Sequence, residues 1–192
     1  CKPEYIGVIF YKASPRHVGK LAPSLVQSIS SVKKVGVFVN ETEIHILDCV
    51  SRYGLDLVQL HGDESPEFCA KIKRSVPVIK AFQIHDEFDF ATLRVYADAC
   101  DYFLFDSKSQ NYGGSGRSFN HSKLEEYNME KQVFLSGGLN LNVTEDILYL
   151  RSMHPQVMAI DVNSRFEIGP GIKDINKINQ LKRQLSAFAS LR

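Results

Sequence analysis

The sequence lacks a long hydrophobic run and a secretion leader. None of its 192 residues lies in an apolar stretch close to the roughly 18 residues that a membrane-spanning helix needs, so no membrane partner is expected. The first residues, CKPEYIGVIF, have neither the basic leader nor the cleavage site of a signal peptide. We therefore expect a cytoplasmic protein.

An excess of charge of either sign is also missing. The formal net charge is +1, and no basic run forms a candidate nucleic-acid patch, so no nucleic-acid partner is expected. A hydrophobic content of 44% and a charged content of 23% are ordinary for a globular protein. The length suits one domain with a sizeable core, and we expect a single domain over residues 1–192.

Cysteine is scarce and is not spaced for metal binding. The cysteines at positions 1, 49, 69 and 100 match no zinc or Cys-x-x-Cys pattern. Cys49, Cys69 and Cys100 fall in segments predicted to be helix or helix end, where we expect reduced, partly buried thiols rather than disulfides. No cluster of histidine, cysteine and acidic residues has metal-ligand spacing, so no metal is expected.

Short apolar runs recur along the chain and alternate with helical patterns. The runs predict strands at 5–10, 34–39, 55–60, 78–82, 102–105, 132–135 and 157–162, and residues 165–174 are predicted to be a polar loop. The helix signals are Pro23 at a first helical position, Asn40 with Glu43 and Asn142 with Glu145 as capping boxes, Gly54 as a stop, Ser65 with Pro66 and Asp86 as starts, Asn120 or His121 as the start of a short helix, and an apolar face of Ile175, Ile178, Leu181, Leu185, Phe188 and Leu191.

Strands that are apolar throughout predict a parallel sheet covered by helices on the outside. The two alternatives are a doubly wound open sheet and a closed (β/α)8 barrel. A doubly wound sheet usually has a glycine-rich phosphate loop after its first strand, and the loop after residues 5–10 has no glycine cluster. We therefore predict an α/β fold of the (β/α)8 TIM-barrel class with seven strands visible, and we expect the remaining strand–helix unit to precede Cys1.

The loops with chemically useful side chains all follow strands, as on the active face of a barrel. Asp106 stands at the end of the 102–105 run, and a loop with Gly113, Gly114 and Gly116 follows it. A carboxylate at a strand end is a candidate catalytic group, although it can also simply cap the loop. Position alone leaves both interpretations open.

A candidate phosphate site follows the two last predicted strands. Gly137 and Gly138 allow a backbone N–H to approach an anion, and Asn163 and Ser164 follow the next strand. A pair of glycines is more often only a tight turn. Small polar residues at two adjacent strand ends shift the balance toward phosphate binding.

Three basic side chains near the strands are further candidates. Arg16 could bind an anion in a bidentate manner, although a solvated loop arginine is the commoner case. His61 could be an acid or base, or a residue that orients its loop by hydrogen bonds, which we favour. Lys80 lies inside an apolar strand and needs a partner or a ligand.

Several stretches resemble the phosphoribosylanthranilate isomerase family of tryptophan biosynthesis. They span nearly the whole chain in the family's order, and QLHGDE and the Asp…YGGSG…F pattern are the most specific among them. The stretches are GVIFYKASPRHV (7–18), KKVGVFVN (33–40), LDLVQLHGDESPEFC (55–69), VIKAF (78–82), FLFDSKSQNYGGSGRSFN (103–120), FLSGGLNLNV (134–143) and IDVNSRFEIGPGIKD (160–174).

This resemblance implies a (β/α)8 barrel that converts N-(5-phosphoribosyl)anthranilate into 1-(2-carboxyphenylamino)-1-deoxyribulose 5-phosphate by an Amadori rearrangement. It implies no metal and no organic cofactor, a small phosphosugar as the partner, and a monomer or homodimer. The position matching the family's general acid is Asp106. The matching substrate contacts are Arg16, Gly137, Gly138, Asn163 and Ser164, to which we add His61 as a candidate.

Two departures from the family pattern matter. The family's general base is a cysteine in a Lys-x-Cys-Gly motif on the first strand, and this motif does not occur in the sequence. Arg165 follows Asn163 and Ser164 where the family usually has Ser-Ser-Gly. The main alternative is a truncated, non-catalytic barrel that binds phosphate. A weaker alternative is another phosphosugar barrel enzyme, such as an epimerase, against which the QLHGDE match argues.

Overall fold

The computed structural model describes residues 3–106, 121–143, 152 and 154–189. The chain forms two compact units. The N-terminal unit comprises Lys2–Phe82 and Ala91–Phe103, and the C-terminal unit comprises Cys1, Gln83–Phe90 and Leu104–Arg192. The single domain expected over residues 1–192 stays a prediction.

Strands are hydrogen-bonded in the order in which they occur in the sequence. In the N-terminal unit, parallel pairs join β1 to β2, β2 to β3 and β3 to β4. In the C-terminal unit, β6 pairs in parallel with β7. All seven predicted strands are confirmed to within two residues at each end. Their bounds are β1 Tyr5–Ile9, β2 Lys33–Phe38, β3 Leu57–Leu60, β4 Val78–Gln83, β5 Tyr102–Asp106, β6 Val133–Ser136 and β7 Val157–Ile160.

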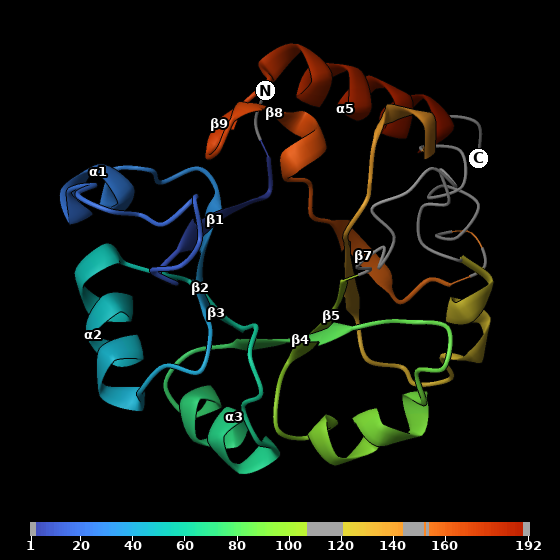
Figure 1. Cartoon of the computed structure of the whole chain (residues 1–192), viewed down its shortest axis with the longest axis horizontal. Helices are drawn as coiled ribbons and strands as arrows, with labels where there is room; N and C mark the ends of the chain where they lie inside the picture. The colour runs from blue at the N-terminus through green and yellow to red at the C-terminus, as the bar shows by residue number, and fades with distance from the viewer. Residues whose placement is uncertain (1–2, 107–120, 144–151, 153, 190–192) are drawn as a thin grey trace. The chain divides into compact units, whose positions relative to one another are not determined.

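Helices α1 (Pro23–Gln27), α2 (Glu43–Tyr53) and α3 (Pro66–Lys73) lie on one side of the strands of the N-terminal unit (Figure 1). Pro23 and Pro66 occupy first turns, as predicted. Gly54 ends α2 in the left-handed region at φ 61°, which glycine adopts without strain. No helix in the described part of the chain is long and apolar enough to cross a membrane.

Two predicted helix starts are wrong. The N-cap of α2 is Thr42, whose side chain accepts a hydrogen bond from the N–H of His45, whereas Asn40 lies outside the helix at φ 50°. An N-cap needs extended backbone, which Thr42 has and Asn40 does not. After Asp86 the chain makes a turn closed by the N–H of Phe88 on the carbonyl of His85, and only a 3-10 helix, η1 (Phe90–Tyr96), follows.

The C-terminal unit corrects one predicted loop. Residues 165–174 contain the end of a 3-10 turn, η4 (Ser164–Phe166), and an antiparallel hairpin of β8 (Glu167–Gly169) and β9 (Ile172–Lys173). The remaining elements are the 3-10 segments η2 (His121–Glu126) and η3 (Leu141–Val143) and the helix α5 (Ile175–Ala189). The predicted glycine loop after Asp106 and the capping partner Glu145 lie outside the described residues.

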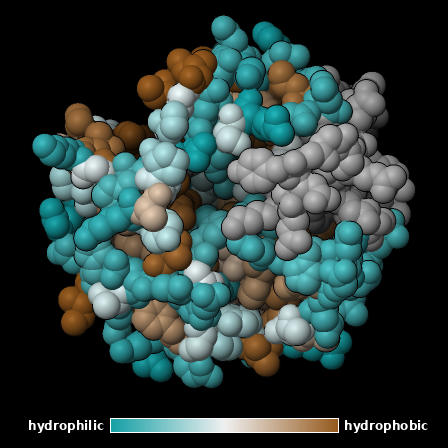
Figure 2. Space-filling model, in the orientation of Figure 1, coloured by the Kyte–Doolittle hydropathy of each residue, from teal (hydrophilic) through white to brown (hydrophobic). Residues whose placement is uncertain are grey.

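The predicted apolar face of α5 is confirmed in part. Leu181 is buried, but Ile175 is 56% exposed. Ile168 and Ile172 on the hairpin are 74% and 59% exposed, and brown atoms mark this region at the top of Figure 2. The start of α5 therefore presents apolar side chains outward together with the hairpin.

Each unit has its own aromatic core. In the N-terminal unit, Phe10 stacks on Phe38 and meets Tyr53 edge-on, with ring centroids 4.9 Å apart in both pairs. In the C-terminal unit, Phe90, Phe105 and Tyr127 meet at 5.2 to 5.7 Å. The cysteines at positions 49, 69 and 100 are buried and are not joined by disulfide bonds.

Candidate active site

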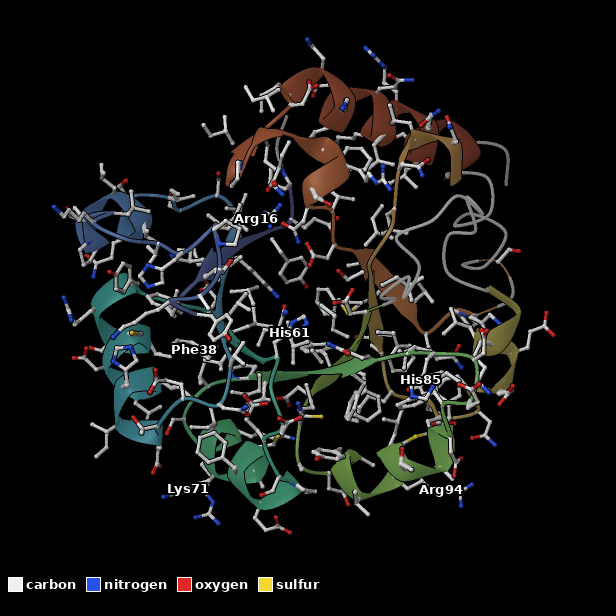
Figure 3. The ribbon with its side chains drawn as sticks, in the orientation of Figure 1. Arg16, Phe38, His61, Lys71, His85 and Arg94 are labelled. Carbon is white, nitrogen blue, oxygen red and sulfur yellow. The ribbon has the colours of Figure 1, made fainter. Side chains whose placement is uncertain are left out.

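The loop after β3 carries His61. Strand β3 is buried along its whole length, so the loop begins at a fixed position. Figure 3 shows His61 on the side of the strands away from α2 and α3, whereas Lys71 lies on the outer side of α3. The buried Gln59 places its amide nitrogen 2.7 Å from His61 Nδ1. With the amide as donor, His61 Nδ1 is the acceptor.

Lys80 finds the partner that its position in an apolar strand requires. Its side chain and that of Glu64 are both 3% exposed, and Nζ lies 3.0 Å from Glu64 Oε2. Nζ also donates to the carbonyl oxygens of Gly62 at 2.7 Å, Ala81 at 3.1 Å and Leu60 at 3.3 Å. These contacts provide hydrogen-bond acceptors for the buried ammonium group, and they fix the backbone on both sides of His61.

Glu64 fixes the same loop from its other side. Its carboxylate accepts the N–H of Asn40 at 2.9 Å and the N–H of Gly62 at 3.0 Å. Asn40 Oδ1 accepts the N–H of Asp63 at 2.7 Å. A Cβ on Gly62 would lie 2.8 Å from the backbone nitrogen of Asn40, so only glycine fits here. Asn40, Glu64 and Lys80 thus form one network, which we call the β3-loop network.

Arg16 lies in the loop that follows β1 (Figure 3). The loop turns back on the strand through hydrogen bonds of His17 N–H to the Ser14 carbonyl and of Val18 N–H to the Ile9 carbonyl. Ser14 Oγ also accepts the N–H of Arg16 at 3.2 Å. The Arg16 side chain is half-buried at the carboxyl end of the strand, where the sequence predicted an anion contact.

Asp106 is the last residue of β5, as predicted. The residues before it are buried, and Asp106 itself is half-buried. Its carbonyl accepts the N–H of Ile84 at 3.0 Å, so the strand stays paired up to its final residue. The carboxylate is therefore carried by rigid backbone rather than by a loose loop.

Gly137 and Gly138 follow β6 with φ of 88° and 61°. Both angles lie in the region that side chains disfavour, so this turn requires glycine. A Cβ on Gly138 would meet no described atom within 4 Å. Backbone geometry rather than crowding selects glycine at position 138, and the space beside it is open to another group.

The end of β7 adjoins the end of β6. Asp161 N–H donates to the carbonyl of Leu135 at 2.7 Å, and Ser136 Oγ lies 3.3 Å from Asp161 Oδ2. The Asn163 amide reaches both oxygens of Asp161 at 3.3 Å. Ser164 is exposed at the start of η4. The sequence prediction that these two strand ends lie together is thus confirmed for the C-terminal unit.

Lys173 is a candidate that the sequence did not reveal. Its Nζ donates to Asn163 Oδ1 at 2.9 Å, to the Val162 carbonyl at 2.7 Å and to Glu167 at 3.0 Å. Its ammonium group lies at the end of β7, beside a predicted phosphate residue, and is paired with the carboxylate of Glu167. The signal that could have found it is the single lysine of the hairpin, a segment that the sequence predicts to be a polar loop.

One possible ligand group was missed as well. Among the residues that the structure describes, His45, Asp48 and Cys49 on α2 bring their ligand atoms within 4.8 Å of one another. No metal-ligand spacing was predicted from the sequence for these three positions. Neighbours at i, i+3 and i+4 meet on one face once the segment is helical.

Parallel strands paired in sequence order, with helices between them and polar groups at their carboxyl ends, define the (β/α)8-barrel class. The family model described as N-(5'phosphoribosyl)anthranilate (PRA) isomerase matches residues 1–184. The chain belongs to the N-(5'-phosphoribosyl)anthranilate isomerase family, which acts in tryptophan biosynthesis.

Relatives and solved structures agree with this assignment. The N-(5'-phosphoribosyl)anthranilate isomerase of Parabacteroides distasonis is 45% identical over 186 residues, which cover 94% of this chain and 83% of that protein. The crystal structure of phosphoribosyl anthranilate isomerase from Thermotoga maritima matches with a TM-score of 0.82 and 34% identity, covering 96% of this chain and 88% of that one. A phosphoribosyl anthranilate isomerase in complex with reduced 1-(o-carboxyphenylamino)-1-deoxyribulose 5-phosphate matches with a TM-score of 0.78 and 30% identity over 96% of this chain and 88% of that one.

Proposed function

We propose that the protein isomerises N-(5-phosphoribosyl)anthranilate to 1-(2-carboxyphenylamino)-1-deoxyribulose 5-phosphate by general acid and base catalysis. A proton delivered to the furanose ring oxygen breaks the C1–O bond and leaves a Schiff base. Removal of the C2 proton then gives an enolamine, and its tautomerisation gives the ketone. The observation that carries the proposal is the family match over residues 1–184, with a related isomerase bound to a reduced form of the same product.

Asp106 is our general acid. It stands at the carboxyl end of β5, where barrel enzymes place catalytic groups, and the paired strand holds it in position. In its protonated form the carboxyl group donates to the ring oxygen. The rigid backbone at the end of β5 favours this role because a misplaced acid loses much of its catalytic effect.

The phosphate is bound, in this proposal, by the turn of Gly137 and Gly138 together with Asn163 and Ser164. The positive φ angles turn the backbone sharply, and the open space at Gly138 allows an anion to approach its amide. Lys173 donates to the Asn163 side chain and pairs with Glu167, and the Asn163 amide in turn donates to Asp161. We propose that Arg16 and His61 contact the substrate as well.

No described cysteine is suited to be the base. Cys49 and Cys69 are buried on helices, and burial raises the pKa of their thiols to about 11 and about 12. Such thiols stay protonated at neutral pH and cannot accept the C2 proton. Cys100 is buried too, and its thiol lies 3.3 Å from the carbonyl of Tyr96. We propose that the base is a group outside the described residues, and the sequence contains no Lys-x-Cys-Gly motif to name it.

Turnover of the fluorescent substrate tests the proposal. We expect Asp106→Asn to lower kcat by about 10²–10⁴-fold, because the amide cannot deliver the proton. The matched control is Asp86→Asn, an exposed aspartate in the turn before η1, which should keep its activity. Full activity in Asp106→Asn would overturn the role of Asp106.

The alternative of a non-catalytic phosphate-binding barrel makes a different prediction for the same chain. It predicts binding of the reduced product analogue with no turnover by the 192 residues. Measuring both binding and turnover on one preparation separates the two functions. A small phosphosugar as the partner, a monomeric or homodimeric state and a cytoplasmic location belong to the proposal, and sedimentation and cell fractionation test the last two.

A further inference from the structure

Helix α2 carries a group of three possible metal ligands on one face. His45, Asp48 and Cys49 are spaced i, i+3 and i+4, and their ligand atoms all lie within 4.8 Å of one another. His45 and Asp48 are exposed, and the buried Cys49 lies beneath them. The helix lies on the outer side of the strands of the N-terminal unit (Figure 1). A cation from solvent can therefore reach the group past the two exposed side chains.

The spacing of sulfur and nitrogen fits a tetrahedral ion. Zn²⁺ binds cysteine sulfur at about 2.3 Å and histidine nitrogen at about 2.0–2.1 Å, so a tetrahedral angle puts the two atoms about 3.6 Å apart. Cys49 Sγ lies 3.7 Å from His45 Nε2. An ion can bridge the two side chains with almost no movement of the helix.

The simpler interpretation is that these side chains only form hydrogen bonds and ion pairs with one another and with Arg52, without a metal. The thiol and the imidazole are within hydrogen-bond reach, and Arg52 lies 3.2 Å from Asp48 Oδ2. Both interactions are compatible with a metal. A thiol–imidazole contact is weak, and a carboxylate has two oxygens, so Arg52 can orient one while the other binds the ion.

Charge around the thiol also favours a cation. Asp48 and Glu41 both place negative charge close enough to Cys49 to act on it, and Arg52 supplies the opposing positive charge. Thiolate and imidazole are ligands of the softer and borderline ions, whereas magnesium and calcium prefer oxygen. The ligand set therefore selects ions such as Zn²⁺ and Cd²⁺.

We propose that His45, Asp48 and Cys49 form a surface site for one thiophilic divalent cation, with water as the fourth ligand. Binding replaces the S–H bond by a metal–sulfur bond and releases one proton to solvent. The site is structural or regulatory rather than catalytic, because it lies on the helix side of the strands and the candidate residue His61 lies on the other (Figure 3). It does not depend on the isomerase activity.

Titration with Cd²⁺ alone tests the site. The 192-residue chain is used with Cys1→Ser, so that the N-terminal thiol does not contribute. We expect one equivalent of Cd²⁺ to produce the ultraviolet charge-transfer band of a cadmium–thiolate bond. Cys49→Ser should abolish this band. His45→Gln removes a direct ligand. Loss of a second-shell partner already weakens metal binding by about 10–100-fold, so we expect His45→Gln to weaken Cd²⁺ binding by at least that factor.

Cys69→Ser is the matched control. Cys69 is buried on α3, and the contact that its thiol makes is with the backbone carbonyl of Glu64 at 4.0 Å, so the variant should keep the band. Circular dichroism checks that each variant is folded, and His45 is exposed, so its replacement should not disturb the core. A band that survives in Cys49→Ser, or unchanged affinity in folded His45→Gln, would overturn the proposal.

Discussion

At the scale of single residues, the buried ion pair of Lys80 and Glu64 is the strongest constraint on the loop that carries His61. Lys80→Met would leave the Glu64 carboxylate buried without its countercharge. Breaking such a pair costs about 3–5 kcal/mol, and we expect the free energy of unfolding from urea denaturation to fall by that amount.

Lys71→Met is the matched control for this variant. Lys71 pairs with Glu43 at the surface, where its side chain is 57% exposed, so its loss should cost about 0–1 kcal/mol. Removing both buried charges in Lys80→Met with Glu64→Gln should restore part of the loss. Equal losses of stability in Lys80→Met and Lys71→Met would contradict a special role for the burial of Lys80.

Gly62 provides a second test of the β3-loop network. Gly62→Ala would place a methyl group 2.8 Å from the Asn40 backbone nitrogen, which cannot move without breaking its bond to Glu64. We expect a loss of about 1–3 kcal/mol, typical of overpacking, measured by thermal unfolding. Gly7→Ala, whose Cβ would meet Val37 at an ordinary 3.8 Å, should change stability little. A stable Gly62→Ala variant would show that the loop can rearrange.

The sequence predicted this network only in part. An apolar strand containing Lys80 required a partner, and that requirement could be stated from burial alone. The partner could not be identified, because Glu64 reaches Lys80 through a turn whose shape depends on Asn40 at positive φ. Periodicity carries no information on such turns.

At the scale of elements, the start of α2 is set by Thr42. Thr42→Ala removes the oxygen that accepts the N–H of His45, and we expect a loss of about 0.5–2 kcal/mol in the free energy of unfolding. Ser51→Ala, on an exposed position within the same helix, should be neutral or slightly stabilising because alanine is the better helix former. Equal effects of the two changes would argue against the cap.

The strands were predicted well and the hairpin was not, for one physical reason. A buried parallel strand is a continuous apolar run, and β3 is buried at every position. Strands β8 and β9 have three and two residues, which is too short for any pattern. Asn40 and Asp86 were mistaken for helix starts because residue type was visible in the sequence and backbone conformation was not.

At the scale of the whole molecule, the class and the family followed from the sequence, because the motifs span the chain and the alternation of strand and helix is regular. The placement of Asp106, the proposed general acid, at a strand end was also predicted. The position of Lys173 was not predicted, since it depends on the hairpin that brings its ammonium to Asn163.

Alkaline pH should destabilise the fold through Cys69. Burial raises the pKa of its thiol from 9.0 to about 12, so above pH 9 the unfolded chain binds fewer protons at this group than the folded one. Stability is then lost as pH rises from about 9 toward 12, at about 1.4 kcal/mol per unit. Between pH 8 and pH 10, urea midpoints should fall less in Cys69→Ala than in the parent chain. An equal fall of the urea midpoint in Cys69→Ala and in the parent chain would contradict this role of Cys69.

The sequence-order pairing of the first four strands has a consequence for chain entropy. Tyr5 pairs with Lys33, Val35 with Leu57 and Val58 with Val78, so the closed loops have nearly equal lengths. Loop-closure cost grows only with the logarithm of length, and these loops differ by a few tenths of a kcal/mol at most, about half of the roughly 0.6 kcal/mol for a doubling. The order in which these strands join is therefore decided by side-chain packing, not by the cost of bringing distant segments together.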